Sequence, residues 1–99
     1  MGVPKARKEF ESSLLFPDGY FSRIRIWEVA EPVHPSGHRF KYSCVYGRSG
    51  ERVVLYDNER GKGDHRHYGD HEEEYTFKDI EGLIADFMAD VRRMRGEGA

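Results

Sequence analysis

Apolar and polar residues alternate along three stretches that are separated by loops too short to contain a domain of their own. These stretches are "YFSRIRIWEV" (20–29), "RFKYSCVY" (39–46) and "ERVVLYD" (51–57). Alternation with a period of two, with many aromatic and β-branched residues, is typical of strands that bury one face. Only residues 47–50 join the last two stretches, so these must pair as antiparallel neighbours. The centre of the chain therefore predicts an antiparallel sheet.

Two further stretches extend this sheet, and a helix follows it. "FESSLLF" (10–16) precedes a turn at Pro-Asp-Gly, and "EEEYT" (72–76) favours a short edge strand. Thr76 and Asp79 have the spacing of a capping box, with Thr76 as the N-cap. The apolar residues after them recur with the period of an amphipathic helix: Phe77, Ile80, Leu83, Ile84, Phe87, Met88, Val91 and Met94. We expect an α+β fold, a four- to five-stranded antiparallel meander sheet with one C-terminal amphipathic helix packed on one face.

Length and composition restrict the class of protein. The 99 residues predict a single domain over residues 1–99, with the basic residues 1–8 expected to fray. No apolar run approaches the roughly 20 residues that a membrane-spanning helix needs, and the first residues lack the apolar segment of a signal peptide. A lone cysteine, Cys44, excludes an intrachain disulfide and a Cys-based zinc site. These features predict a cytoplasmic protein with no membrane partner.

Charge is divided unevenly along the chain. The formal net charge is −2, but residues 1–56 carry nine Lys and Arg against six Asp and Glu, whereas residues 57–99 carry seven against twelve. If the isoleucines of 20–29 face the helix, the cations of that stretch share the opposite face with those of its neighbour. The resulting patch contains Arg23, Arg25, Trp27, Arg39 and Lys41. Cations beside an aromatic ring on a sheet suit single-stranded nucleic acid, although such a face can also be merely solvated or dock an acidic protein.

A second candidate site lies in "LYDNERGKGDHRHYGD" (55–70). His65 and His67 are two residues apart, so in an extended segment both rings point to the same side. Histidine titrates near neutrality and can act as general base or acid in RNA cleavage, removing the 2′-hydroxyl proton or protonating the leaving oxygen. A nearby carboxylate, Asp57 or Asp64, can orient a ring or complete a metal shell. The candidate catalytic residues are His65, His67, Asp57 and Asn58, and the candidate cations beside them are Arg60, Lys62 and Arg66.

Two other interpretations of this segment remain open. The His-x-His spacing recurs in metal sites, but the segment lacks the third and fourth ligands of a defined zinc motif. A metal at the His pair is thus an open alternative that we do not predict, and we predict no other cofactor. Alternatively, Asp57 and Asn58 form an Asx-type turn and the histidines are solvated in a polar loop. His71, which precedes three glutamates, fits the second interpretation.

The order of these segments resembles the TumE family of small toxin–antitoxin proteins. Members of that family show a Tyr-containing strand, a strand ending in Arg-Tyr-Asp-Asn or similar, a His-x-His segment and a closing helix. The corresponding parts here are "HRFKYSCVYGRSGERVVLYDN", "HRHYGDHEEE" and "TFKDIEGLIADFMADV", within about residues 20–94. The chain departs from the family pattern at Leu55, where members often carry Arg, and in its shorter segment before the histidines.

The resemblance implies a prokaryotic toxin that a helix-turn-helix antitoxin neutralises. Combined with the histidine pair, it gives our first hypothesis, a ribonuclease-like toxin that acts on RNA through the His-x-His site. The alternative is a non-catalytic module that binds nucleic acid or protein with the basic face of the sheet. A third interpretation is a homodimer that pairs exposed sheet edges.

Overall fold

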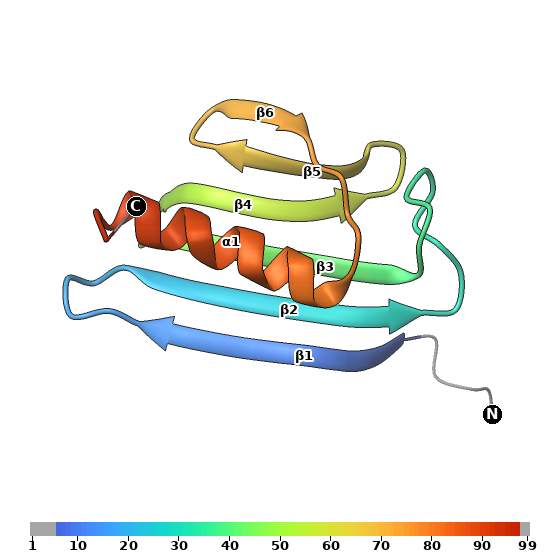
Figure 1. The fold of residues 1–99 in the computed structure, drawn as a ribbon, viewed down its shortest axis with the longest axis horizontal. Coiled ribbons are helices and arrows are strands. Elements are labelled where there is room, and N and C mark those ends of the chain that lie inside the picture. The colour runs from blue at the N-terminus through green and yellow to red at the C-terminus, as the bar shows by residue number, and fades with distance from the viewer. Residues whose placement is uncertain (1–5, 98–99) are drawn as a thin grey trace.

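The computed structural model describes residues 6–97, which form six strands and one helix (Figure 1). The elements are β1 (Ala6–Leu15), β2 (Phe21–Val29), β3 (Phe40–Arg48), β4 (Glu51–Glu59), β5 (Gly63–Tyr68), β6 (His71–Glu74) and α1 (Ile80–Met94). The strands form one sheet in the order of the sequence, and every neighbouring pair is antiparallel. The predicted α+β class and antiparallel meander are confirmed.

The number of strands differs from the predicted four to five. The additional strand is the histidine segment itself, because β5 pairs with β4 on one side and with β6 on the other. Gly61 and Gly63 adopt φ values of 89° and 79°, which other residues avoid, so the chain reverses direction within residues 60–62. The side chains of β5 are mostly polar, so apolar alternation could not reveal this strand.

The two ends of the described chain also differ from expectation. Residues 6–8, expected to fray, are the first residues of β1, and the rest of that segment lies outside the described residues. The predicted capping box is wrong. The N-cap of α1 is Asp79, whose side chain accepts a hydrogen bond from the Gly82 N–H at 2.6 Å. Phe77 lies before the helix because its ring stacks on His38, with 3.9 Å between the ring centroids.

The core lies between α1 and one face of the sheet. In Figure 1, α1 crosses in front of the central strands, and β1 and β6 are the two edges. One buried cluster combines helix and sheet residues: Leu83, Phe87 and Val91 with Ile24, Ile26, Tyr42, Cys44, Tyr46, Val54, Tyr56 and Tyr75. The helix residues in this cluster belong to the predicted apolar stripe. Within residues 6–97, α1 falls short of the length and hydrophobicity needed to cross a bilayer.

A buried polar cluster ties α1 to the sheet. The hydroxyls of Tyr56 and Tyr68 donate hydrogen bonds to the carboxylate of Asp90, the latter at 2.6 Å, and the Arg93 guanidinium lies 2.5 Å from the same side chain. Burial alone would raise the pKa of Asp90. The hydrogen bonds from the two tyrosines and Arg93 outweigh burial, so the pKa of this carboxyl is lowered.

We therefore expect the free energy of unfolding to fall as the pH is lowered below about 5. A carboxyl with a depressed folded pKa stabilises the fold above its unfolded pKa, and that contribution is lost as the pH falls through the folded value. Urea denaturation at neutral pH and at about pH 3.5 tests this. The Asp90→Asn variant should be less stable at neutral pH and should lose less stability on acidification. An equal loss in both proteins would contradict a role for Asp90.

Candidate functional site

His65 and His67 project from β5 on the face of the sheet that α1 does not cover. In an antiparallel pair, residues directly opposite one another share a face. Asp57 of β4 lies opposite His65, and Leu55 lies opposite His67. The intervening Tyr56 contacts Phe87 of α1, with 5.7 Å between the ring centroids. Asp57 and both histidines therefore point away from the helix, toward what we call the open face.

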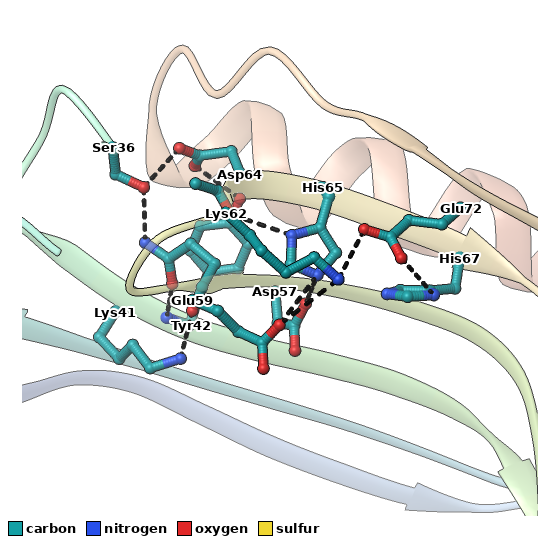
Figure 2. Close-up of polar contacts among 12 residues, drawn as sticks. Ser36, Lys41, Tyr42, Asp57, Glu59, Lys62, Asp64, His65, His67 and Glu72 are labelled. Atoms are coloured by element: carbon teal, nitrogen blue, oxygen red, sulfur yellow. Dashed lines mark hydrogen bonds and ion pairs between the residues drawn. The ribbon is translucent and has the colours of Figure 1, made fainter. Parts of the chain in front are cut away.

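Three of the four predicted catalytic residues come together there, and we call Asp57, His65 and His67 the histidine cluster. One nitrogen or oxygen atom of each side chain lies within 4.8 Å of the others. The two imidazole centroids are 5.0 Å apart, with the rings nearly perpendicular. Figure 2 shows both rings beside the Asp57 carboxylate. The side chain of His65 is 4% exposed and that of His67 is 20% exposed, so a ligand meets His67 first.

The two ring nitrogens of His65 have different neighbours. Its Nδ1 lies 2.9 Å from the carbonyl oxygen of Gly63, which can only accept, so Nδ1 carries a proton and donates it. The other nitrogen, Nε2, lies 2.7 Å from Asp57 Oδ1. The distance is short enough for a hydrogen bond, but the relative orientation of the two groups is not that of one. Neither of these buried atoms has a hydrogen-bond partner among residues 6–97. The contact is therefore a close approach of two polar atoms and not a formed hydrogen bond.

Acidic side chains surround the histidine cluster. Glu59 Oε1 lies 3.7 Å from His65 Nε2, and Glu72 Oε1 lies 4.0 Å from His67 Nδ1. Lys62 Nζ lies 2.8 Å from Glu72 (Figure 2). The hydrogen bond between these two raises the pKa of Lys62 and lowers the pKa of Glu72, so both are charged at neutral pH. Three carboxylates thus face one lysine. Of the other predicted cations, Arg66 lies on the helix side, where it binds Glu73 and Tyr56.

Asn58 is not part of the histidine cluster. Its side chain is fully buried, and its Oδ1 accepts a hydrogen bond from the Tyr42 N–H at 3.1 Å. Its Nδ2 donates to the Phe40 carbonyl at 2.7 Å and to Ser36 Oγ at 3.3 Å. The amide thus continues the pairing of β3 and β4 beyond Ser43 and Asp57, the last backbone pair at this end. Asn58 positions the strand end that carries Asp57.

Asp64 also lies away from the cluster, contrary to the expectation that it orients the ring of His65 or His67 or completes a metal shell with them. Its carboxylate accepts hydrogen bonds from Ser36 Oγ at 2.6 Å, Tyr42 Oη at 2.7 Å and His38 Nε2 at 2.7 Å. Burial would raise the pKa of Asp64, but these three bonds outweigh it, and the pKa is lowered. Ser36 and His38 both bind the carboxylate, so the group fastens a loop. No periodicity of the sequence indicated this group, since its members come from three distant segments.

The predicted nucleic-acid-binding residues of β2 lie on the open face as well. Arg25 lies in the cross-strand row that runs through Ser43 and Asp57 to His65. Arg23 lies in the row that runs through Val45 and Leu55 to His67. Each arginine is three strand spacings from the histidine in its row, which corresponds to about 14 Å across the sheet. Trp27 lies opposite Lys41. The cations and the histidine cluster therefore share one surface.

Several of these cations have partners within the chain. Arg25 Nε lies 3.7 Å from Glu11, and an Arg39 nitrogen lies 3.9 Å from Glu28. The Lys41 ammonium donates a hydrogen bond to the Asn58 carbonyl (Figure 2). Exposed ion pairs at such distances contribute little and exchange readily for a phosphate. Arg23 and Arg25 are exposed, whereas Lys41 is partly buried.

The family model described as Toxin TumE matches residues 5–95, nearly the whole chain. This chain belongs to the TumE toxin family. The resemblance stated from the sequence is thereby confirmed, and it makes the chain a toxin component of a toxin–antitoxin system, with an antitoxin as its partner. Comparison with curated proteins and with solved structures gave no match.

The motif that carried the resemblance divides into two parts in this TumE toxin. Asp57, His65 and His67 lie on the open face, where His67 is exposed to a ligand and His65 is buried behind it. Tyr56 and Asn58 face the core, where they bind Asp90 and the backbone of β3. Because neighbouring residues of a strand point to opposite faces, a contiguous Tyr-Asp-Asn sequence serves both the site and the fold.

Proposed function

We propose that this TumE toxin acts on RNA, with the histidine cluster as the reaction centre and the cations of β2 and β3 holding the strand. The observation that supports the proposal is that Arg23 and Arg25 lie on the open face in the same cross-strand rows as the histidines. A single strand laid across the sheet would place its phosphates on Arg23 and Arg25 and a base on Trp27. About 14 Å further along the rows it would reach the histidines.

The chemistry of RNA cleavage matches the groups in the cluster. Attack by the 2′-hydroxyl requires a group that takes its proton, a group that protonates the leaving oxygen, and positive charge near the phosphate. Imidazoles exchange protons near neutral pH, and His67 is the accessible member of the pair. Asp57 lies beside the buried His65, whose ring is oriented by its hydrogen bond to the Gly63 carbonyl. Lys62 is the predicted cation that lies with the cluster.

Expression of the toxin in a bacterial host should arrest growth, and the His65→Ala/His67→Ala variant should relieve the arrest. Loss of groups that transfer protons typically lowers a rate by about 10²–10⁴. The measurements are colony counts after induction and cleavage of total RNA by purified protein. His67→Ala alone is the milder variant, because His67 is less buried than His65. His71→Ala is the matched control, since His71 lies in the same hairpin and is 67% exposed. If the double variant is soluble and folded but still fully toxic, the proposed role of the two histidines is ruled out.

A second candidate function is a non-catalytic module that binds nucleic acid or protein through the basic face. The exposure of Arg23 and Arg25 beside Trp27 favours it. Under this function, Arg23→Glu/Arg25→Glu should abolish toxicity while the double histidine variant remains toxic. Under the proposed function both variants lose toxicity. If the two arginines bind phosphates, RNA binding by the variant should also depend less steeply on salt concentration, with the slope reduced by the equivalent of about two phosphate contacts.

For the partner, we infer a helix-turn-helix antitoxin, as the family resemblance implies. The homodimer remains a prediction. The two edges available for it are β1, which has ten residues, and β6, which contains three glutamates. Like charges on β6 discourage pairing there, so β1 is the edge on which a second copy would add.

A further inference from the structure

The histidine cluster contains two buried polar atoms that approach closely without bonding. His65 Nδ1 donates its proton to the Gly63 carbonyl, and when the ring is neutral Nε2 keeps a lone pair beside the carboxylate oxygen of Asp57. Neither atom has a hydrogen-bond partner among the described residues. An unpaired buried polar atom is unfavourable, and two acceptors side by side repel. A cation placed between them would satisfy both.

The surroundings have the features of a metal site in three respects. A histidine that ligates a metal usually donates its other ring N–H to a carbonyl or carboxylate, as His65 does to Gly63. The ligating atoms of Asp57, His65 and His67 lie within 4.8 Å of one another. Bonds of about 2.0–2.1 Å at tetrahedral angles separate two ligand atoms by roughly 3.3 Å. His65 Nε2 and Asp57 Oδ1, now 2.7 Å apart, would need to move only slightly.

The charge of the site favours a cation over a bare phosphate. Asp57, Glu59 and Glu72 bring three carboxylates, while Lys62 is engaged by Glu72 at 2.8 Å. A phosphodiester approaching this group would be repelled, because the carboxylates outnumber the lysine. A divalent ion would be attracted and would then present positive charge to the phosphate.

We propose that Asp57, His65 and His67 bind one divalent transition-metal ion of the zinc class. Imidazole nitrogens suit Zn²⁺ and its neighbours in the first transition row, whereas Mg²⁺ prefers an all-oxygen shell. Three protein ligands leave a position open, which is the pattern of catalytic zinc sites. When bound, the ion supplies Lewis acidity and a water of lowered pKa at the point where the open face meets the histidines. The inference rests on the proposed function and deepens it, since it names what the same site holds. With the ion bound, the two imidazoles would serve as its ligands instead of exchanging protons themselves.

Titration of the purified, chelator-treated full chain with Zn²⁺ tests the proposal without RNA. We expect binding of one ion by calorimetry, and a rise in melting temperature with Zn²⁺ concentration. Co²⁺ should give visible absorption bands at the same stoichiometry, and Mg²⁺ should not compete. His67→Ala and Asp57→Asn should weaken Zn²⁺ binding by at least about 10–100-fold. His71→Ala is the matched control and should bind as the unaltered chain does.

The outcomes separate the metal proposal from the proposed function. Zn²⁺ binding that is lost in His67→Ala and kept in His71→Ala supports the metal site, even if the protein does not cleave RNA. Absence of Zn²⁺ and Co²⁺ binding by the folded chain overturns it, as does equal binding by all variants. RNA cleavage that persists in excess chelator would overturn a part for the ion in the reaction, but not the binding site that the titration measures.

Discussion

Replacing Asn58 by Ala should lower the free energy of unfolding by about 3–4 kcal/mol. The side chain is fully buried and bonds the Tyr42 N–H and the Phe40 carbonyl, where β3 and β4 no longer pair through their backbones. Alanine would leave both backbone groups buried and unsatisfied, at about 1–3 kcal/mol each. Urea denaturation of the variant and the unaltered chain measures the difference.

The matched control for Asn58 is Ser43→Ala, since Ser43 lies on the same pair of strands but is exposed. Substitutions of this kind usually change stability by less than about 0.5 kcal/mol. The Asn58→Ala variant should also lose toxicity at temperatures where it stays folded, because Asn58 holds the end of β4 that carries Asp57. If Asn58→Ala unfolds at the same urea concentration as Ser43→Ala, the side chain does not connect the strands as described.

Replacing Gly47 by Ala should destabilise the chain by about 3 kcal/mol or more. A Cβ atom at this position would lie 2.1 Å from the Glu51 carbonyl oxygen and 3.1 Å from Arg52 Cα. Both atoms belong to the backbone of β4, so no side-chain rotation can relieve the overlap. The register of β3 and β4 shifts at this position, which brings the two backbones together. Overpacking typically costs about 1–3 kcal/mol, and a clash with backbone falls at or above the upper end.

Gly37→Ala is the matched control for Gly47, because no atom lies within 4 Å of a Cβ atom built at Gly37. We expect Gly37→Ala to leave the free energy of unfolding within about 0.5 kcal/mol of the unaltered value. Thermal and urea unfolding of the two alanine variants in parallel isolate the effect of the close backbone approach. A Gly47→Ala protein as stable as Gly37→Ala would show that the hairpin tolerates a side chain there.

The two-layer architecture determines where chemistry can occur in this TumE toxin. One helix covers one face of a six-stranded sheet, so the other face is left to solvent. Asp57, His65 and His67 lie on that face with Arg23 and Arg25. Side chains on paired strands are held at fixed spacings by the backbone ladder, which is a more rigid support than a loop. The alternative interpretation of this segment as a polar loop is therefore wrong, and the site is built on strands.

Much of this fold was predictable from local pattern. The buried side of each main element could be predicted because two patterns that reveal it are local in the sequence. These are the alternation of apolar and polar residues at 20–29, 39–46 and 51–57, and the apolar stripe of α1. The Tyr-Asp-Asn and His-x-His motifs likewise indicated the family. Strand β5 escaped prediction because its side chains are mostly polar and show no apolar period, although it pairs with a strand on each side. The N-cap was assigned to Thr76 because spacing alone cannot show that Phe77 packs on His38.

By itself, then, the sequence determined the class of fold, the buried side of its main elements and the family to which the chain belongs. Only the tertiary structure decided which polar residues meet. It brought Asp57 to His65, directed Asn58 into the core and engaged Asp64 with Ser36 and His38. The physical reason is that hydrogen bonds and charges act over a few ångströms between segments far apart in the chain. Their partners therefore depend on strand register, which no single stretch of sequence specifies.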